Sequence, residues 1–278
     1  MNRKVIDQNN LKSFSNYFKK RESSQIIANA VMKNGINDSA LNNQSIKKMH
    51  YDFSEEIDVG KVTNQQKSGR CWMFAALNNI RYSISKDLNI KEHDFELSQA
   101  YTMFWDKLEK ANYFLENIIS TVELELDSRR VMWLLNEPTN DGGQWDMFTA
   151  LIEKYGIVPK YVMPETYSSS NSRYLNKILN LKLRDLAKRL RQDYKLGADR
   201  ESLREEKEIM LAEIYSILVY FLGEPPQKFD FEYKDKDGEF YRDRGLTPEE
   251  FYNKYSKVKM TDYVSIINAP TSDKEFDQ

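Results

Sequence analysis

The sequence has few of the residues and segments that characterise secreted or membrane-spanning chains. Its 278 residues include a single cysteine, Cys71, so no disulfide can form within the chain. No run approaches the roughly 18 apolar residues of a membrane helix, and the residues after Met1 lack the apolar region of a secretory signal. A reducing compartment keeps cysteine as a thiol, so these absences together predict a cytoplasmic protein.

A surplus of charge is also lacking. The 41 basic residues nearly balance the 43 acidic ones, and the net charge of -2 gives no whole-chain signal for nucleic acid or membranes. Apolar residues make up 40% and charged residues 30%, as in ordinary globular proteins. The length allows one large domain or two smaller ones.

Apolar periodicity predicts a mostly helical chain. We expect a short helix near residues 6–20 followed by loops, and further helices over 71–88, 97–119 and 128–135. Asp141, with a glutamine three residues later, is predicted as the N-cap of another helix. Two long amphipathic helices are predicted over 172–222. Alternating patterns predict an extended segment over 51–57, a hairpin through Asp237 and Gly238, and a last strand over 263–267.

Cys71 stands at the start of one of these helices. Apolar residues follow it at steps of three or four, which predicts a helix of about five turns: Met73, Leu77, Ile80, Ile84 and Leu88. A lone cysteine is most often a small buried hydrophobe. At a helix N-terminus, however, free N–H groups and the helix dipole favour the thiolate, and we expect Arg70 to add to this effect. A nucleophilic or redox-sensing thiol is therefore an alternative to a structural one.

The residues around Cys71 carry a more specific signal. Residues 64–75 are Asn-Gln-Gln-Lys-Ser-Gly-Arg-Cys-Trp-Met-Phe-Ala, with Gln65 six positions before the cysteine. This run resembles the nucleophile segment of papain-like cysteine peptidases. Ser68 and Arg70 depart from the signature of the secreted members and fit the branch of aminopeptidase C and bleomycin hydrolase. Further stretches resemble the same branch, among them residues 96–101, 140–147, 153–165 and 222–226.

The resemblance, which runs from about residue 50 to the end, implies an α+β papain-like fold with a helical, nucleophile-bearing half. It implies an N-terminal extension over 1–55 and the helical half over 56–165. A helical insertion over 166–226 would follow, and then a hairpin, a short helix and the start of a β-rich second half over 227–278. Most of that second half would be missing.

The resemblance also implies roles for particular residues. Cys71 would be the catalytic nucleophile, and the amide of Gln65 with the Cys71 N–H would form the oxyanion hole, each donor worth about 2.7–4 kcal/mol in the transition state. Gly142 and Gly143 would bind the substrate backbone, because a Cβ would block its approach. Taken alone, Gln65 would be a solvated loop residue and the glycines part of a helix start. The family removes N-terminal residues from short peptides as a hexamer, with no metal or organic cofactor.

The remaining catalytic groups are not evident in the sequence. A thiol peptidase needs a histidine base and a group that orients it, and papain-like enzymes place them roughly 130–150 residues after the cysteine. The two histidines here are His50, before the nucleophile, and His93, in a polar turn where we expect it to be exposed. We therefore expect the catalytic His and Asn to lie beyond Gln278 and the chain to be inactive alone.

A basic helix suggests a different function. Residues 173–195 hold eight Lys or Arg residues and two Asp residues. A solvated face, balanced by the acidic residues of 201–208, is the simpler interpretation. The alternative is a non-catalytic paralogue that acts in oligomer assembly or nucleic-acid binding. The helix has no base-reading motif and no interleaved aromatic residues, which weighs against nucleic acid.

Overall fold

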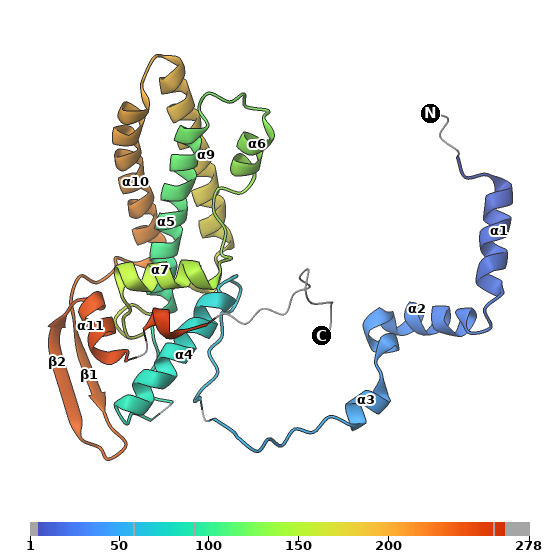
Figure 1. Cartoon of the computed structure of the whole chain (residues 1–278), viewed down its shortest axis with the longest axis horizontal. Helices are drawn as coiled ribbons and strands as arrows, with labels where there is room; N and C mark the ends of the chain where they lie inside the picture. Colours follow the sequence, from blue (N-terminus) through green and yellow to red (C-terminus); the bar gives the residue numbers. More distant parts are fainter. Residues whose placement is uncertain (1–4, 58, 92, 258, 265–278) are drawn as a thin grey trace. The chain divides into compact units, whose positions relative to one another are not determined.

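The computed structural model describes residues 5–57, 59–91, 93–257 and 259–264 (Figure 1). The chain divides into two compact units with the boundary between Ile57 and Asp58. The finer division at residues 165 and 226 stays a prediction. Among the described residues, no helix is both long and apolar enough to cross a membrane.

The first unit consists of three helices: α1 (Gln8–Lys19), α2 (Ser24–Ala40) and α3 (Asn43–Lys47). A capping box between Asp7 and Asn10 begins α1, which confirms the predicted helix. The expectation of loops after it was wrong, because the polar residues that follow form α2 and α3. Gly35, at φ +79°, bends α2. Residues 51–57 form no strand, and none of the described residues of this unit is buried.

The second unit contains all the other elements. Its helices are α4 (Cys71–Asp87), α5 (Gln99–Ser120), α6 (Arg129–Asn136), α7 (Trp145–Tyr155), α8 (Tyr167–Ser170), α9 (Arg173–Lys195), α10 (Arg200–Leu222), α11 (Pro248–Tyr255) and the 3-10 helix η1 (Met260–Asp262). Its strands β1 (Phe229–Lys234) and β2 (Phe240–Leu246) pair in an antiparallel hairpin. Residues 265–267 of the predicted last strand lie outside the described residues, and Tyr263 and Val264 are not in a strand.

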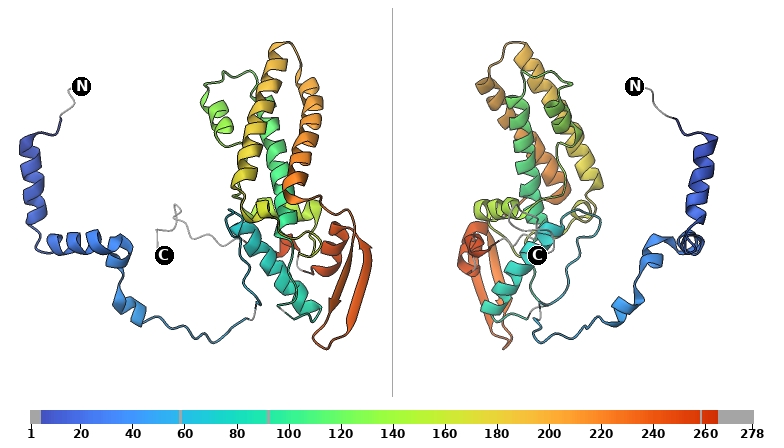
Figure 2. Two further views of the ribbon diagram at one scale, coloured as in Figure 1. Left: turned by 180° about the vertical axis from the view of Figure 1, so that it is seen from behind. Right: turned by 45° about the vertical axis from the view of Figure 1, so that its right-hand side comes forward.

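Three long helices form one part of the core. α5, α9 and α10 lie side by side, as Figures 1 and 2 show from three directions. The predicted leucine stripe of α9 is fully buried against its neighbours: Leu175, Leu179, Leu183, Leu186 and Leu190. A stripe of this width fixes which face of α9 points inward and leaves its basic residues on the remaining faces.

The other part of the core gathers around α4. The apolar stripe that begins two residues after Cys71 is buried as predicted, and α4 packs against α5 and α7. The β1–β2 hairpin places Phe231 against Phe251 of α11, with ring centroids 4.8 Å apart. The capping box between Thr247 and Glu250 starts α11.

Gly156 allows the end of α7 to lie against the start of α11. It ends α7 with φ +67°, and a Cβ built on it would lie 2.3 Å from the main chain of Pro248 at the start of α11. The neighbouring Ile157 N–H donates to the Pro248 carbonyl at 3.3 Å. No side chain fits this contact, so the helices approach each other only because position 156 is glycine.

Replacement of Gly156 tests this contact. Gly156→Ala combines an unfavourable left-handed residue with a main-chain clash, so we expect a loss of about 3 kcal/mol in the free energy of unfolding. Gly197 has φ +103° but nothing within 4 Å of a built Cβ. Gly197→Ala is therefore the matched control and should cost only about 1 kcal/mol. Equal losses in urea unfolding would contradict the role of the contact.

Candidate active site

Cys71 is the first residue of α4, and its side chain is exposed. The position agrees with the sequence-based expectation, whereas the structural alternative of a buried thiol does not hold. The N–H groups of a first helical turn have no acceptor within the helix, so they favour negative charge at this point. The loop before Cys71 determines how the thiol is presented.

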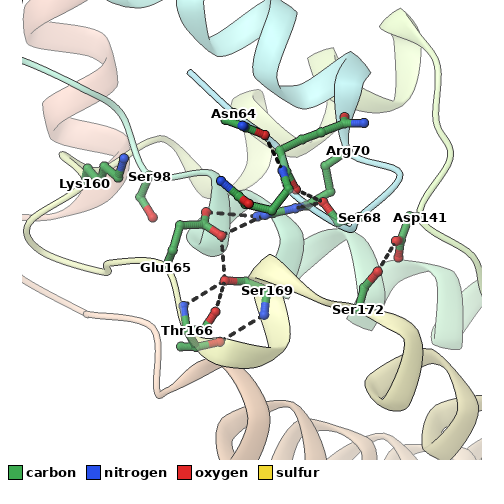
Figure 3. Close-up of polar contacts among 12 residues, drawn as sticks. Asn64, Ser68, Arg70, Ser98, Asp141, Lys160, Glu165, Thr166, Ser169 and Ser172 are labelled. Carbon is green, nitrogen blue, oxygen red and sulfur yellow. Dashed lines mark hydrogen bonds and ion pairs between the residues drawn. The ribbon is translucent and has the colours of Figure 1, made fainter. Parts of the chain in front are cut away.

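Arg70 fixes that loop from inside the protein. Its guanidinium is only 1% exposed and forms a two-pronged ion pair with Glu165, at 3.0 and 2.7 Å, as Figure 3 shows. Its Nε donates to Ser68 Oγ at 2.9 Å, and Ser169 Oγ donates to the same carboxylate at 2.6 Å. Glu165 compensates the charge of Arg70, so the contribution of Arg70 to a Cys71 thiolate stays a prediction.

Asp141 fixes the loop from the other side. One carboxylate oxygen accepts the Gly69 N–H at 2.9 Å and Ser172 Oγ at 2.5 Å, the latter drawn in Figure 3. The other accepts Lys107 Nζ at 2.7 Å and Asn176 Nδ2 at 2.8 Å. The predicted N-cap role of Asp141 was wrong. α7 begins at Trp145 with Gln144 as its N-cap, because the Asp141 carboxylate is fully used by these longer-range contacts.

The two glycines differ in their surroundings. A Cβ on Gly143 would lie 2.4 Å from the ring of Trp72, whereas a Cβ on Gly142 would meet only Asn140 Oδ1, at 3.6 Å. The Trp72 indole donates to the Asp141 carbonyl at 2.8 Å. Gly143 is therefore required by packing within the chain, and the role of both glycines in substrate binding stays a prediction.

Gln65 lies in the same loop and is half-buried. Its main-chain carbonyl accepts from Ser68 Oγ at 2.7 Å, and Lys67 N–H donates to the Ser170 carbonyl at 3.0 Å. The side-chain Oε1 of Gln65 is buried and has no hydrogen-bond partner among the described residues. The loop is thus held by its neighbours, and the oxyanion role of Gln65 remains a prediction.

The histidine of the second unit does not lie beside Cys71. His93 is the one histidine there and is exposed, as expected. It follows the C-terminal end of α4, and a 17-residue helix spans about 25 Å from Cys71 to that end. His93 lines a separate cavity with Lys160 and Glu232. His50 belongs to the first unit and is also exposed.

Comparison with known proteins adds to this geometry. A model of the peptidase C1-like family matches residues 5–278.

The chain belongs to the peptidase C1-like family.

Similar proteins in this family include aminopeptidases C and W. Aminopeptidase C of Listeria innocua serovar 6a is 52% identical over 268 residues, which cover 96% of this chain and 60% of that protein. Aminopeptidase W of Lactobacillus delbrueckii subsp. lactis is 42% identical over 260 residues, or 94% of this chain and 59% of that protein. The crystal structure of PepW from Lactobacillus rhamnosis HN001 matches with a TM-score of 0.91 and 53% identity, over 98% of this chain and 60% of that one.

The comparison confirms the predicted fold class. The chain has the α+β papain-like fold of the peptidase C1-like family, mostly helical with one two-stranded sheet among its described residues. It spans about 60% of the length of the relatives that it matches. Local sequence patterns indicated no role for Lys107 or Glu165 and the wrong role for Asp141. The reason is that the ion-pair partners are distant in sequence: Lys107 and Asp141 are 34 residues apart, and Arg70 and Glu165 are 95 apart.

Removal of either partner of the Asp141–Lys107 pair is expected to be costly. Lys107 is fully buried, so Asp141→Asn removes its ion pair and leaves the ammonium with the Asn140 carbonyl and the charge of Asp106. This should lower the free energy of unfolding by about 3–5 kcal/mol. Lys107→Met should do similar damage, and the double variant should lose less than the sum of the two. Asp127→Asn, at an exposed site, is the control and should change stability by under about 0.5 kcal/mol. Additive losses in urea unfolding would rule out the coupling.

The same carboxylate makes stability depend on pH. Burial alone would raise the pKa of Asp141, but the Lys107 charge and the hydrogen bonds from Gly69 and Ser172 outweigh it and lower this pKa well below its usual range. Its stabilisation is complete above the unfolded-state pKa of about 3.9 and is lost as the pH falls toward the lowered folded-state value. Below about pH 4 the native chain should therefore lose stability more steeply than Asp141→Asn. Parallel slopes in urea midpoints would contradict this.

Proposed function

We propose that this chain carries the nucleophile-bearing part of a cytoplasmic cysteine-type aminopeptidase that removes N-terminal residues from short peptides. The main support is the exposed thiol of Cys71 at the start of α4, in a segment where Asp141 accepts hydrogen bonds from Gly69 and Trp72. A packing cysteine would be buried, whereas a nucleophile needs an open thiol on a fixed backbone. The names of the relatives, aminopeptidases C and W, support the same reaction.

In this proposal Cys71 Sγ attacks the carbonyl carbon of the scissile bond. The sulfur–carbon bond forms as the carbonyl π electrons move to oxygen, and the thiol proton passes to an imidazole. The amide of Gln65 and the Cys71 N–H donate to the oxyanion. The imidazole then returns the proton to the departing amine as the carbon–nitrogen bond breaks, and water hydrolyses the thioester. Gly142 and Gly143 hold the substrate backbone.

In this proposal the imidazole is not that of His93. His93 lies at the far end of α4, and catalytic groups that act as a unit give little rate when one is absent. We therefore expect the chain alone to release aminoacyl-coumarin at least about a thousandfold more slowly than a complete family member. Turnover at a comparable rate, abolished by Cys71→Ala, would show that the base lies within the chain.

An aldehyde tests the nucleophile and the oxyanion hole without turnover. A free-amine amino aldehyde such as leucinal, labelled with ¹³C at the carbonyl, should form a hemithioacetal at Cys71 that is visible by NMR, because the thiol adds to the carbonyl and its proton ends on oxygen. Cys71→Ser should abolish the signal. Gln65→Ala should weaken the adduct about tenfold or more, because one donor to its oxygen is lost.

Lys67→Ala provides the loop control for Gln65→Ala. The N–H of Lys67, not its side chain, donates to the Ser170 carbonyl, so the substitution should leave the affinity for the aldehyde unchanged. Equal weakening by both variants would mean that Gln65 acts only through the loop. No adduct at Cys71 would remove the nucleophile assignment itself.

Assembly into a homo-oligomer, a hexamer in this family, remains part of the proposal. Nucleic-acid binding remains the weaker alternative function of the basic helix α9. Two of its basic residues already pair with carboxylates of α10, since Lys182 contacts Glu213 and Arg189 contacts Glu206. These pairs favour the interpretation of a balanced face over that part of the helix.

A further inference from the structure

The basic helix α9 borders a cavity in the second unit. A cavity of about 980 Å³ lies between α9, residues 122–126 after α5, and the turn at 197–199 that leads into α10. Four basic residues of α9 line it: Arg184, Lys188, Arg191 and Lys195. Their spacing of three or four residues puts them on one face of the helix, so the groove has a basic wall about three turns long.

The two arginines build this groove. Arg184 donates to the carbonyl oxygens of Leu135 and Asn136, at 2.7 and 2.6 Å. Arg191 donates to those of Thr121 and Leu124, at 3.1 and 2.5 Å. These acceptors are neutral, so the contacts fix the opposite wall and the position of both guanidiniums while leaving their positive charge uncompensated.

The two lysines are exposed at the groove. Lys188 and Lys195 form no ion pair with a carboxylate of the described residues, and neither do the two arginines. This distinguishes the groove from the adjoining face of α9, where Lys182 and Arg189 are paired with α10. The positive charge of the helix is therefore concentrated on the face that lines the cavity.

The rest of the lining is mixed. Leu124, Leu126 and Leu135 offer apolar surface, and Gln192 and Tyr194 of α9 add polar groups. Glu123 and Glu125 stand on the wall opposite α9, and Asp199 lies at the turn before α10. Glu123 is already engaged with Arg200 and Tyr194. A uniform polyanion such as a nucleic-acid backbone would be attracted by one wall and repelled by the other. A peptide can place acidic side chains along the basic wall of α9 and apolar ones against the leucines of the lining.

We propose that this groove binds an acidic peptide segment of a partner protein, with Glu or Asp residues alternating with apolar ones. The acidic side chains pair with Lys188, Lys195 and the free donors of the two arginines. The apolar side chains cover Leu124, Leu126 and Leu135, which are exposed or half-buried. The groove is lined by α9, residues 122–126, Leu135 and residues 197–199, and Cys71 contributes nothing to it, so the interaction is independent of the peptidase site.

The test uses the whole chain and a fluorescein-labelled peptide of alternating Glu and Leu. Anisotropy should show saturable binding that weakens with added salt, and a Lys–Leu peptide should not bind. Lys188→Glu and Lys195→Glu should each weaken binding about tenfold, because an attraction becomes a repulsion. Lys177→Glu is the matched control, since it makes the same charge change on an exposed site of α9 outside the groove, and it should leave binding unchanged.

Several outcomes would overturn the proposal. One is that the peptide does not bind, and another is that all three substitutions weaken its binding equally. A third is that a single-stranded oligonucleotide displaces the peptide and that Lys188→Glu weakens the binding of this oligonucleotide. The last result would assign the groove to nucleic acid. Since both lysines are exposed, circular dichroism should show that the variants remain folded, and Cys71→Ser should bind the peptide as the native chain does.

Discussion

The buried pair of Lys107 and Asp141 holds the second unit together at the point where its parts meet. Lys107 comes from α5, the Ser172 and Asn176 donors come from the start of α9, and the Gly69 N–H comes from the loop before α4. A carboxylate with four donors is stable in an apolar setting only while those donors stay in place. The helical core and the thiol loop therefore depend on one charged group.

The ion pair of Arg70 and Glu165 complements this arrangement from the other side of the loop. Gly69 is held by one carboxylate, and Arg70, the next residue, is held by another. Two fixed points so close to Cys71 leave its main chain little freedom, which is the preorganisation that an oxyanion hole made partly of backbone requires. In both ion pairs opposite charges meet, so the carboxylates that hold the loop each have a cationic partner.

The sequence predicted those elements whose signals are local. The leucines of α9, the stripe after Cys71 and the Thr247 capping box all repeat or pair within a few residues, and each formed where expected. Asp141 shows the limit of such reasoning. Its spacing from Gln144 suggested a helix cap, but partners distant in sequence competed for the same carboxylate and won, because a buried ammonium gains more from it than an exposed N–H does. The number of charges on α9 likewise did not predict which basic residues form ion pairs and which do not. Their pairing depends on how α9 packs against α10.

The contact between Gly143 and Trp72 links the variation of two positions that are far apart in sequence. While an indole occupies position 72, even one added methyl group at 143 overlaps it. A smaller ring at 72 would make room, but it would also give up the indole hydrogen bond to Asp141. Substitution of either position alone is therefore costly. Among related sequences, a side chain at position 143 should appear only together with a change at position 72.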